Sequence, residues 1–452
     1  MSTAAHAAID WQAAGDEMID HLRALLRLDT RNPPGNERLA AEYLQAVLVR
    51  EGIASQIVGP SPERATLIAR LQGDGSAAPL LLMSHTDVVA VEPDKWSYDP
   101  FAATVTPDGW LYGRGALDMK HMVAMELMTL LLLKRAGVPL KRDVIFMAAA
   151  DEETGGEQGA GWVVRHHPEL IQAEYALNEG GGVATEINGR RYYTVQTAEK
   201  GTARFRLRAR GTPGHGSRPH PDNAILKLAA ALARLREQQP PAHFTKSLRG
   251  FVEGIAAAQP PEVAAQLRAV LADEAGVDAA IAALPLPESF KLQLNAMVRN
   301  TIAPTMLRAG TQINVIPSEA EAGLDGRMLP GWTTDRFREE IRAIVGDELE
   351  LEFLDDTEPL EADPESPLFD TIRAVLAEHD PEARAIPTLL TGATDAKHVA
   401  KLGIKVYGFA PWPYDGPDEW SRIHGHDERI SLRAARWGVR VLYDVVARFA
   451  GA

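Results

Sequence analysis

Two hydrophobic patterns alternate along the first part of the chain. Continuous apolar runs occur at 80–83 and 144–150, and such runs are typical of strands that are buried on both faces of a sheet. Segments with helical spacing lie before and between them, at 18–26 and at 119–134, the latter rich in Met and Leu without Pro or Gly. Strand and helix therefore alternate, which predicts an α/β domain with helices on both faces of its sheet.

A different pattern begins near residue 198. From 202 to 210, small or apolar residues alternate with four arginines, as expected for an antiparallel strand with one solvated face. Residues 238–300 favour helices, a second alternating stretch covers 312–325, and apolar strand signals return at 404–409. We therefore expect a second, α+β domain with an antiparallel sheet to be inserted into the first. The expected boundaries are 1–198, 199–328 with a helical insertion at about 238–300, and 329–452.

Composition narrows the range of partners and sites. The 452-residue chain has 47 basic and 62 acidic residues, a net charge of −15. Nucleic acids and anionic membranes bind basic surfaces, so we expect neither as a partner. The stretch 347–370 contains 11 acidic residues and no basic one, and we interpret it as a solvated edge. No cysteine is present, so any metal must be held by histidine and carboxylate groups.

We find no pattern typical of a membrane-spanning helix or a signal peptide in the sequence. The best apolar candidate, 122–133, is shorter than a membrane-spanning helix and includes Glu126. Residues 1–18 lack the basic and apolar regions of a signal peptide. We therefore expect a cytoplasmic protein.

Polar side chains follow the predicted strands. His85 and Asp87 come directly after the first buried run, and residues two apart in an extended segment point the same way. A histidine beside a carboxylate suits a metal ligand and the group that fixes its tautomer, although a structural His–Asp pair is an alternative. Asp118 ends a Gly-spaced loop just before a helix, where a helix N-cap is the simpler interpretation.

Acidic residues gather after the second and third apolar runs. Asp151, Glu152 and Glu153 are consecutive, and such carboxylates repel one another unless a cation neutralises them. Glu179 follows the short apolar stretch 175–177. Strand ends of this kind meet at the ligand-binding edge of an open α/β sheet.

A histidine cluster late in the chain, His424 and His426, adds imidazole to this set. Imidazole and carboxylate without thiolate suit zinc, cobalt or manganese. The acids are too many for one tetrahedral ion, so we expect two ions bridged by one carboxylate.

Together these motifs resemble the M20 family of metallopeptidases, which includes aminoacylase, carboxypeptidase G2 and succinyl-diaminopimelate desuccinylase. The resemblance runs from the Asn-Pro-Pro-Gly turn at 32–35 to the motif around His424. HTDVV, GRGALDMK, DEETGG, NEGG and HGHDE occur in the family's order. The resemblance implies a mixed-sheet zinc-peptidase catalytic domain and an inserted lid domain.

The same resemblance implies two zinc ions per chain, with cobalt or manganese as substitutes. Asp118 would bridge the two ions. His85 and Glu179 would complete one metal site, and Glu153 and His424 would complete the other.

Two further acids receive roles from the resemblance. Asp87 would orient His85, and Glu152 would act as the general base that carries a proton from the attacking water to the leaving amine. His426 is a competitor for the ligand role of His424, although the family pattern favours His424 because it precedes the glycine. His121 stands where a small residue is common, and we interpret it as a surface histidine.

The inserted domain supplies substrate contacts by the same resemblance. His215 would stabilise the oxyanion, with a hinge role as the alternative. Asn314 and Arg327 would contact the substrate carboxylate, since a guanidinium pairs bidentately with that group; a surface ion pair is the alternative for Arg327. The loop with Gly392 and Thr394 matches a substrate-binding loop.

The expected activity is hydrolysis of an amide bond next to a free carboxylate, by an exopeptidase or an N-acyl-amino-acid amidohydrolase acting on a small substrate. A homodimer through the lid domain is a further expectation, because the lid pairs subunits in several family members. One alternative is a catalytically inactive binding protein that retains the fold. A dinucleotide-binding enzyme, suggested by the glycines at 155–161, is disfavoured because they follow an acidic loop and form no G-x-G-x-x-G.

Overall fold

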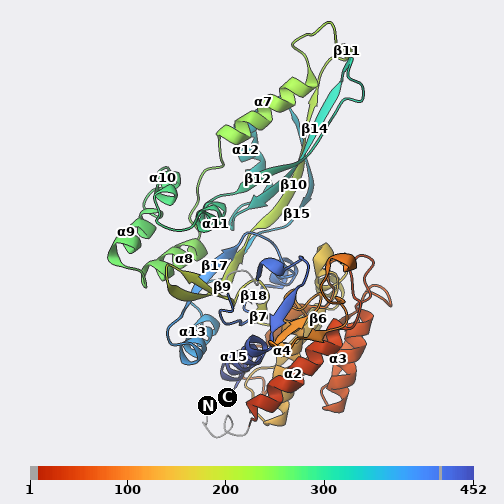
Figure 1. Ribbon diagram of the computed structural model, residues 1–452, viewed down its shortest axis with the longest axis vertical. Helices are drawn as coiled ribbons and strands as arrows, with labels where there is room; N and C mark the ends of the chain where they lie inside the picture. Colours follow the sequence, from red (N-terminus) through yellow and green to blue (C-terminus); the bar gives the residue numbers. More distant parts are fainter. Residues whose placement is uncertain (1–8, 417–419, 452) are drawn as a thin grey trace. The chain divides into compact units, whose positions relative to one another are not determined.

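The computed structural model describes residues 9–416 and 420–451. The chain separates into two compact units (Figure 1). The first comprises Met1–Thr197, Ala362–Thr388 and Thr394–Ala452, and the second comprises Ala198–Glu361 and Leu389–Ala393. The second unit thus interrupts the first in sequence and extends past residue 328 to Glu361. The first eight residues, part of the stretch examined for a signal peptide, lie outside the described residues.

A large mixed sheet forms the centre of the first unit, with strands in the order β1-β2-β6-β3-β7-β18-β9 and with β8 and β17 paired to β9. β3 pairs in parallel with β6 and β7, and β18 pairs in parallel with β7. A small separate sheet has the order β19-β5-β4. The strands are β1 (Ser55–Val58), β2 (Thr66–Leu71), β3 (Leu80–His85), β4 (Thr104–Val105), β5 (Trp110–Tyr112), β6 (Val144–Ala149), β7 (Tyr175–Asn178), β8 (Ala184–Ile187), β9 (Arg190–Glu199), β17 (Arg384–Leu390), β18 (Lys405–Gly408) and β19 (Arg429–Ser431).

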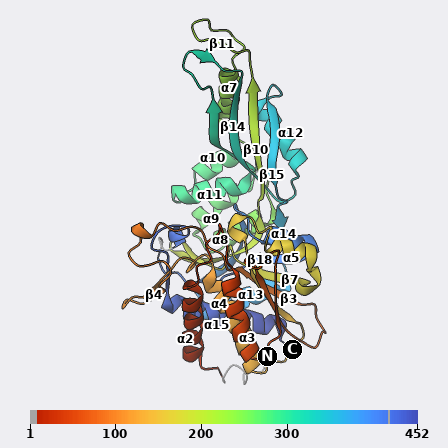
Figure 2. The ribbon, with the colours of Figure 1, turned by 90° about the vertical axis from the view of Figure 1, so that its right-hand side faces the viewer.

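Both faces of this sheet are buried, as the continuous apolar runs predicted. Leu82 and Phe146 belong to one hydrophobic core with residues of the helices, and their strand neighbours Leu81 and Ile145 are buried on the opposite face. α2, α4 and α15 pack against one another (Figure 2). The helices are α2 (Trp11–Leu26), α3 (Arg38–Arg50), α4 (Lys120–Arg135), α5 (Ala160–His166), α6 (Pro168–Ile171), α13 (Pro367–His379), α14 (Ala396–Val399) and α15 (Leu432–Ala450), with short 3-10 turns η1 (Pro93–Lys95), η2 (Glu152–Thr154), η3 (Ala400–Leu402) and η4 (Trp420–Arg422).

The second unit contains an antiparallel sheet in the order β12-β14-β10-β15, and a two-stranded sheet of β11 and β13. Residues 238–300 form four helices between β11 and β12. The mixed α/β class with an antiparallel α+β insertion is therefore confirmed. The elements are β10 (Gly201–Arg210), β11 (Gly214–His215), α7 (Ala224–Glu237), α8 (Lys246–Ala256), α9 (Pro261–Ala269), α10 (Val277–Ala282), α11 (Glu288–Val298), β12 (Thr301–Ala309), β13 (Val315–Ile316), β14 (Glu319–Met328), α12 (Thr334–Val345), β15 (Glu350–Asp356) and β16 (Leu360–Glu361).

The second alternating stretch begins later than predicted. The structure places the long strand β14 at Glu319–Met328 rather than from residue 312, because a turn and the short β13 occupy 311–318. Pro317, which cannot donate a hydrogen bond to a strand ladder, lies between β13 and β14.

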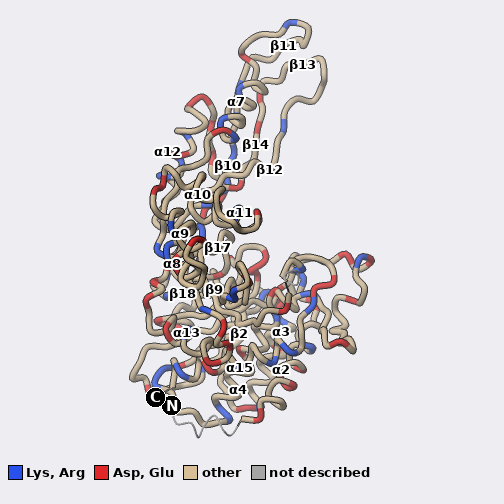
Figure 3. The backbone as a smooth tube through the Cα atoms, turned by 60° about the vertical axis from the view of Figure 1, so that its left-hand side comes forward, with Lys and Arg blue, Asp and Glu red and all other residues tan. Residues whose placement is uncertain are grey.

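The acidic stretch 347–370 is more than a solvated edge. It contains β15, which pairs with the arginine-bearing strand β10. Figure 3 shows acidic and basic positions near β10 and β14. Arg210 lies 2.6 Å from Glu350, and Arg206 lies 3.5 Å from Glu352 and 3.0 Å from Glu321 of β14. Acids on β14 and β15 therefore neutralise the arginines of β10, as cross-strand pairs of opposite charge do.

Among the described residues, no helix is both long and apolar enough to cross a membrane.

Candidate metal centre

The candidate ligands of the first unit come together because three parallel strands end at one edge of the sheet. His85 is the last residue of β3, the turn η2 with Glu152 and Glu153 follows β6, and Glu179 follows β7. Ligand atoms of His85, Glu152 and Glu179 lie within 4.8 Å of one another, and so do those of His85, Asp118 and Glu153. The predicted convergence of strand ends is therefore observed.

Asp118 lies between two histidines. Its Oδ1 is 3.0 Å from Nε2 of His85, and its Oδ2 is 3.0 Å from Nε2 of His424. Glu179 lies 3.9 Å from the first histidine, and Glu153 lies 3.1 Å from the second. One carboxylate thus faces two separate sets of imidazole and carboxylate groups.

Asp87 organises both His85 and the acidic turn. Nδ1 of His85 lies 3.0 Å from the carbonyl oxygen of Asp87 and 3.4 Å from its Oδ1. The proton of the neutral imidazole then belongs on Nδ1, which leaves Nε2 free as a ligand atom. The carboxylate of Asp87 also accepts hydrogen bonds from the backbone N–H groups of Glu152 and Glu153, each at 3.1 Å.

The carboxylates of this cluster stabilise the charged form of both histidines. Burial opposes the charged form of His85, but its hydrogen bonds with Asp118 and Asp87 outweigh burial and raise its pKa well above the ordinary value. Hydrogen bonds with Asp118 and Glu153 raise the pKa of His424 to about 10. Both histidines therefore hold protons against the carboxylates, and a bound cation would take the place of those protons.

Burial favours the protonated form of two acids in this cluster, Glu152 and Glu179. Burial raises the pKa of Glu179 to about 8. Burial, and next the charge of Glu179, raises the pKa of Glu152 well above its ordinary value. Oε1 of Glu153 is buried and has no hydrogen-bond partner among the described residues. Four acids, Asp118, Glu152, Glu153 and Glu179, thus gather around two histidines, an excess of negative charge that fits divalent cations. The nitrogen and oxygen donors of the cluster suit zinc, cobalt or manganese.

A network behind Asp87 was not found from the sequence. Asn32 donates to Asp87 at 2.9 Å, and Arg64 donates to the Asn32 side-chain oxygen at 2.7 Å. Arg64 also pairs with the buried Glu37 at 2.7 Å. Asn32 lies in the Asn-Pro-Pro-Gly turn, which was seen only as a turn, and no local pattern marks Arg64 or Glu37.

Glu428 holds the loop that presents Asp118, and its role was also missed. Its carboxylate pairs with Arg114 at 2.6 Å and accepts hydrogen bonds from the backbone N–H groups of Leu117 at 2.6 Å and Asp118 at 3.1 Å. Glu428 is the last residue of the HGHDE motif that begins at His424, so the motif could have identified it as a site residue.

The structure distinguishes the two late histidines and changes the interpretation of a third. Nε2 of His426 lies 3.0 Å from exposed Glu92, away from the acidic cluster that contacts His424. His121, interpreted as a surface residue, is instead buried against Trp412 and Trp420, because it lies on the first turn of the core helix α4.

The candidate substrate contacts lie mostly in the second unit. His215 is exposed, and its Nδ1 accepts from the Ser217 hydroxyl at 2.8 Å; Gly216, the next residue along, donates its backbone N–H to the Asn314 carbonyl at 2.8 Å. Arg327 pairs with Asp325 through Nε at 2.7 Å and Nη2 at 3.1 Å.

The loop at 391–395 is divided between the units. Gly392 belongs to the second unit and Thr394 to the first. Thr394 accepts a hydrogen bond from Asn178, the last residue of β7, at 2.8 Å. Among the described residues, a Cβ added at Gly392 would meet only the Leu390 side chain, at 3.9 Å.

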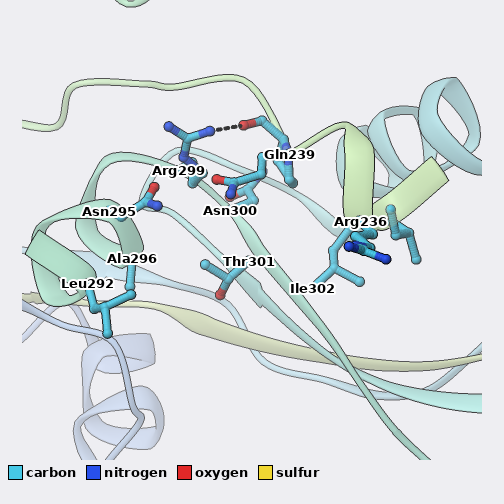
Figure 4. Close-up of a pocket in the computed structure, with 11 residues that line it drawn as sticks. Arg236, Gln239, Leu292, Asn295, Ala296, Arg299, Asn300, Thr301 and Ile302 are labelled. Atoms are coloured by element: carbon cyan, nitrogen blue, oxygen red, sulfur yellow. Dashed lines mark hydrogen bonds between the residues drawn. The ribbon is translucent and has the colours of Figure 1, made fainter. Parts of the chain in front are cut away.

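A separate pocket of about 390 Å³ lies within the second unit, near the end of α7, α11 and β12 (Figure 4). Arg299 lines this pocket. Its guanidinium donates to the Pro240 carbonyl at 3.1 Å and pairs with Asp278. None of the predicted site residues lines this pocket. The buried charge of Arg299 therefore serves to hold the 238–300 segment together.

The comparisons agree with this geometry. The model of peptidase family M20/M25/M40 matches residues 81–448. The chain belongs to this family. It is 30% identical over 391 residues to the N-fatty-acyl-amino acid synthase/hydrolase PM20D1 of Mus musculus (83% of this chain, 75% of that protein) and 26% identical over 439 residues to aminoacylase-1 of Sus scrofa (95% and 94%).

Solved structures show the same fold at low sequence identity. The M20 family metallo-carboxypeptidase Sso-CP2 from Sulfolobus solfataricus superposes with a TM-score of 0.69 at 19% identity, covering 96% of this chain and 99% of that one. The dinuclear metal binding peptidase YXEP of Bacillus subtilis gives a TM-score of 0.62 at 14% identity, covering 97% and 99%.

Family membership makes the protein a hydrolytic enzyme of the M20/M25/M40 peptidase family. The expected enzyme class is therefore confirmed. The inactive binding protein and the dinucleotide-binding enzyme are set aside.

Proposed function

We propose that the protein is a two-zinc amidohydrolase that cleaves an amide bond next to a free carboxylate, with N-acyl amino acids as the favoured substrates and short peptides as the second class. The observation that carries the proposal is the position of Asp118, whose two oxygens each lie 3.0 Å from a different histidine. A carboxylate placed in this way suits a bridge between two cations.

The metal ligands divide into two sets around Asp118. His85 and Glu179 would hold one ion, and Glu153 and His424 the other. Two cations at such a site lower the pKa of a water and polarise a carbonyl group. Cobalt or manganese would serve in place of zinc, because all three accept imidazole and carboxylate ligands.

Glu152 is the proposed general base. It shares the turn η2 with Glu153, and the two side chains belong to different groups of possible ligands around His85. Glu153 would bind metal, and Glu152 would face the reacting water. It would take a proton from the attacking water and pass it to the leaving amine. Asp87 supports this role, because it holds the backbone N–H of Glu152 at 3.1 Å while it orients His85.

The residues of the second unit are proposed to bind the substrate. His215 would donate to the developing oxyanion, and Arg327 with Asn314 would contact the substrate carboxylate. Arg327 already holds the carboxylate of Asp325 by two guanidinium nitrogens, the geometry in which Arg recognises a carboxylate. Gly392 of the second unit and Thr394 of the first would line the substrate-binding loop.

The preference for N-acyl amino acids rests on the relatives. The similar proteins include an N-fatty-acyl-amino acid synthase/hydrolase and an aminoacylase. The test is a hydrolysis screen in which the zinc-loaded protein receives N-acyl amino acids beside dipeptides and C-terminally amidated analogues. Hydrolysis of amidated and free-carboxylate substrates at equal rates would contradict the proposal.

We also propose that two copies pair through the second unit. β12 is an edge strand whose outer residues are exposed, including Met306 at 54% and Leu307 at 66%. The opposite edge strand, β15, carries acids that discourage edge-to-edge pairing, whereas β12 has no acidic residue. The exposed Met306 and Leu307 on this edge suit the contact of an isologous dimer.

A further inference from the structure

A hydrophobic cavity of about 220 Å³ lies beside the metal centre, within the first unit. Its walls include Leu117, Met119, Val183 and Ile423, and the ligand candidates Asp118 and Glu179 also border it. An apolar cavity of about 150 Å³ is enough to bind benzene. The cavity therefore has room for one aromatic ring with a small substituent, or for a short alkyl chain.

The side chain of His121 lines this cavity. It is 2% exposed, and neither ring nitrogen has a hydrogen-bond partner among the described residues. The rings of Trp412 and Trp420 meet it edge-on, with centroids at 5.7 Å and 6.3 Å. Burial lowers the pKa of His121 to about 4, so the imidazole is neutral near pH 7 and offers one donor and one acceptor.

An unpartnered imidazole in an apolar cavity needs an explanation. Buried polar groups in folded proteins are nearly always hydrogen-bonded, and leaving one unpaired is unfavourable. The tryptophan rings supply no acceptor for its N–H in the ring plane, and no side chain within the described part of the chain reaches either nitrogen. A bound group with a polar atom would satisfy it.

We propose that this cavity binds the uncharged acyl group of the substrate, and that His121 forms a hydrogen bond with a polar atom on that group. The inference rests on the proposed function. The amine half of the substrate carries the carboxylate assigned to Arg327, so the acyl half, attached to the carbonyl at the metal centre, is the part left for a cavity bordered by Asp118 and Glu179.

Charge restricts this group further. The described residues around the cavity include two carboxylates and no Lys or Arg. A negatively charged acyl group such as succinyl would be buried without a cationic partner, which is unfavourable. The cavity therefore selects neutral, predominantly apolar acyl groups that carry a single hydrogen-bonding atom.

The test uses four derivatives of one amino acid: N-(4-hydroxyphenylacetyl), N-phenylacetyl, N-acetyl and N-succinyl. For the zinc-loaded wild type we expect kcat/KM to rank in that order, with the hydroxyl worth about tenfold over phenylacetyl, because a site that hydrogen-bonds a group discriminates against its absence. His121→Leu should abolish the hydroxyl preference while keeping phenylacetyl above acetyl.

Val183→Phe fills the cavity and should lower the ratio of phenylacetyl to acetyl kcat/KM by about tenfold or more. Val49→Phe is the matched control, because Val49 is 66% exposed on α3, and it should leave every ratio unchanged. Metal content and thermal midpoint verify that each variant is folded; should His121→Leu not fold, Val183→Phe still decides between the outcomes.

The two proposals fail in different ways. If the wild type hydrolyses the acetyl derivative but neither variant changes the substrate ratios, the cavity is not the acyl site and the proposed function stands. If the wild type hydrolyses none of the four, the preference for N-acyl amino acids in the proposed function is wrong. Calorimetric titration of the same compounds into Glu152→Gln then decides on the cavity, because a hydroxyl preference in Kd that depends on His121 supports it and equal Kd values overturn it.

Discussion

A carboxylate oxygen of Asp87 accepts a hydrogen bond from the backbone N–H of Glu152 at 3.1 Å. The same side chain lies 3.4 Å from His85, so one buried acid connects a proposed metal ligand to the turn that carries the proposed general base. Asp87 is ionised to fill this role, because hydrogen bonds from His85 and Asn32 outweigh the effect of burial and lower its pKa.

Asp87→Ala should therefore weaken metal binding by His85 and loosen the turn that carries Glu152. We expect metal affinity to fall by about 10–100-fold, the usual effect of removing a group that orients a metal ligand. Competition with a chelator of known affinity measures the loss. Asp143→Ala removes a carboxylate that bonds Arg70 and Gly73 at the far end of β6, and unchanged metal affinity in that control would separate the local effect from general destabilisation.

Glu152→Gln separates proton transfer from metal binding. Hydrolysis should fall by at least about 10²-fold, because the amide cannot accept the proton of the attacking water. Metal content should stay near that of the wild type, since the proposed ligands are intact. Elemental analysis and steady-state kinetics provide the two measurements, with Glu157→Gln, an exposed acid paired with Arg165, as the control. A variant that retains full activity would remove Glu152 from the mechanism.

The two late histidines should behave differently. His424→Ala removes a group 3.1 Å from Glu153 and should lower the bound metal toward one ion per chain. His426→Ala removes only the contact with exposed Glu92 and should leave metal content unchanged. Mass spectrometry of the intact holoenzyme counts the ions, and equal losses in both variants would contradict the assignment.

Arg327→Ala should cost activity selectively. Loss of a carboxylate-binding guanidinium should lower kcat/KM by about tenfold or more for substrates with a free carboxylate, because charge-assisted bidentate pairs are strong. C-terminally amidated analogues should be much less affected. Asp325→Ala is the matched control. It removes the partner of the Arg327 guanidinium but leaves the carboxylate-binding group in place.

Leu307→Lys tests the proposed dimer. A lysine in the middle of β12 should oppose edge-to-edge pairing and shift the mass measured by light scattering from two chains to one. Leu354→Lys makes the same change on β15, where Leu354 is 51% exposed, and it should leave the mass unchanged. A wild type that is a monomer at micromolar concentration would overturn the proposal.

Much of the fold follows from local patterns. The runs at 80–83 and 144–150 became strands buried on both faces, and the alternation at 202–210 became β10. These patterns are reliable because burial of a strand leaves a direct trace in its sequence. The start of β14 was misplaced, since period two continues through the turn before it, and the pairing of the acidic stretch with the arginines of β10 could not be read locally.

The sequence by itself determined the chemical types at the site, because the motifs place imidazole and carboxylate groups at strand ends and the lack of cysteine leaves no other strong ligand. The family pattern already favoured His424 over His426, and the structure places His424 beside Asp118. Only the tertiary structure decided that Arg64 and Asn32 stand behind Asp87, and that His121 is buried in a cavity. The physical reason is distance along the chain: Arg64 and Asn32 are 32 residues apart, and Asn32 and Asp87 are 55 apart. Contacts between residues so far apart in sequence depend on how the whole sheet packs, so a local hydrophobic pattern does not predict them.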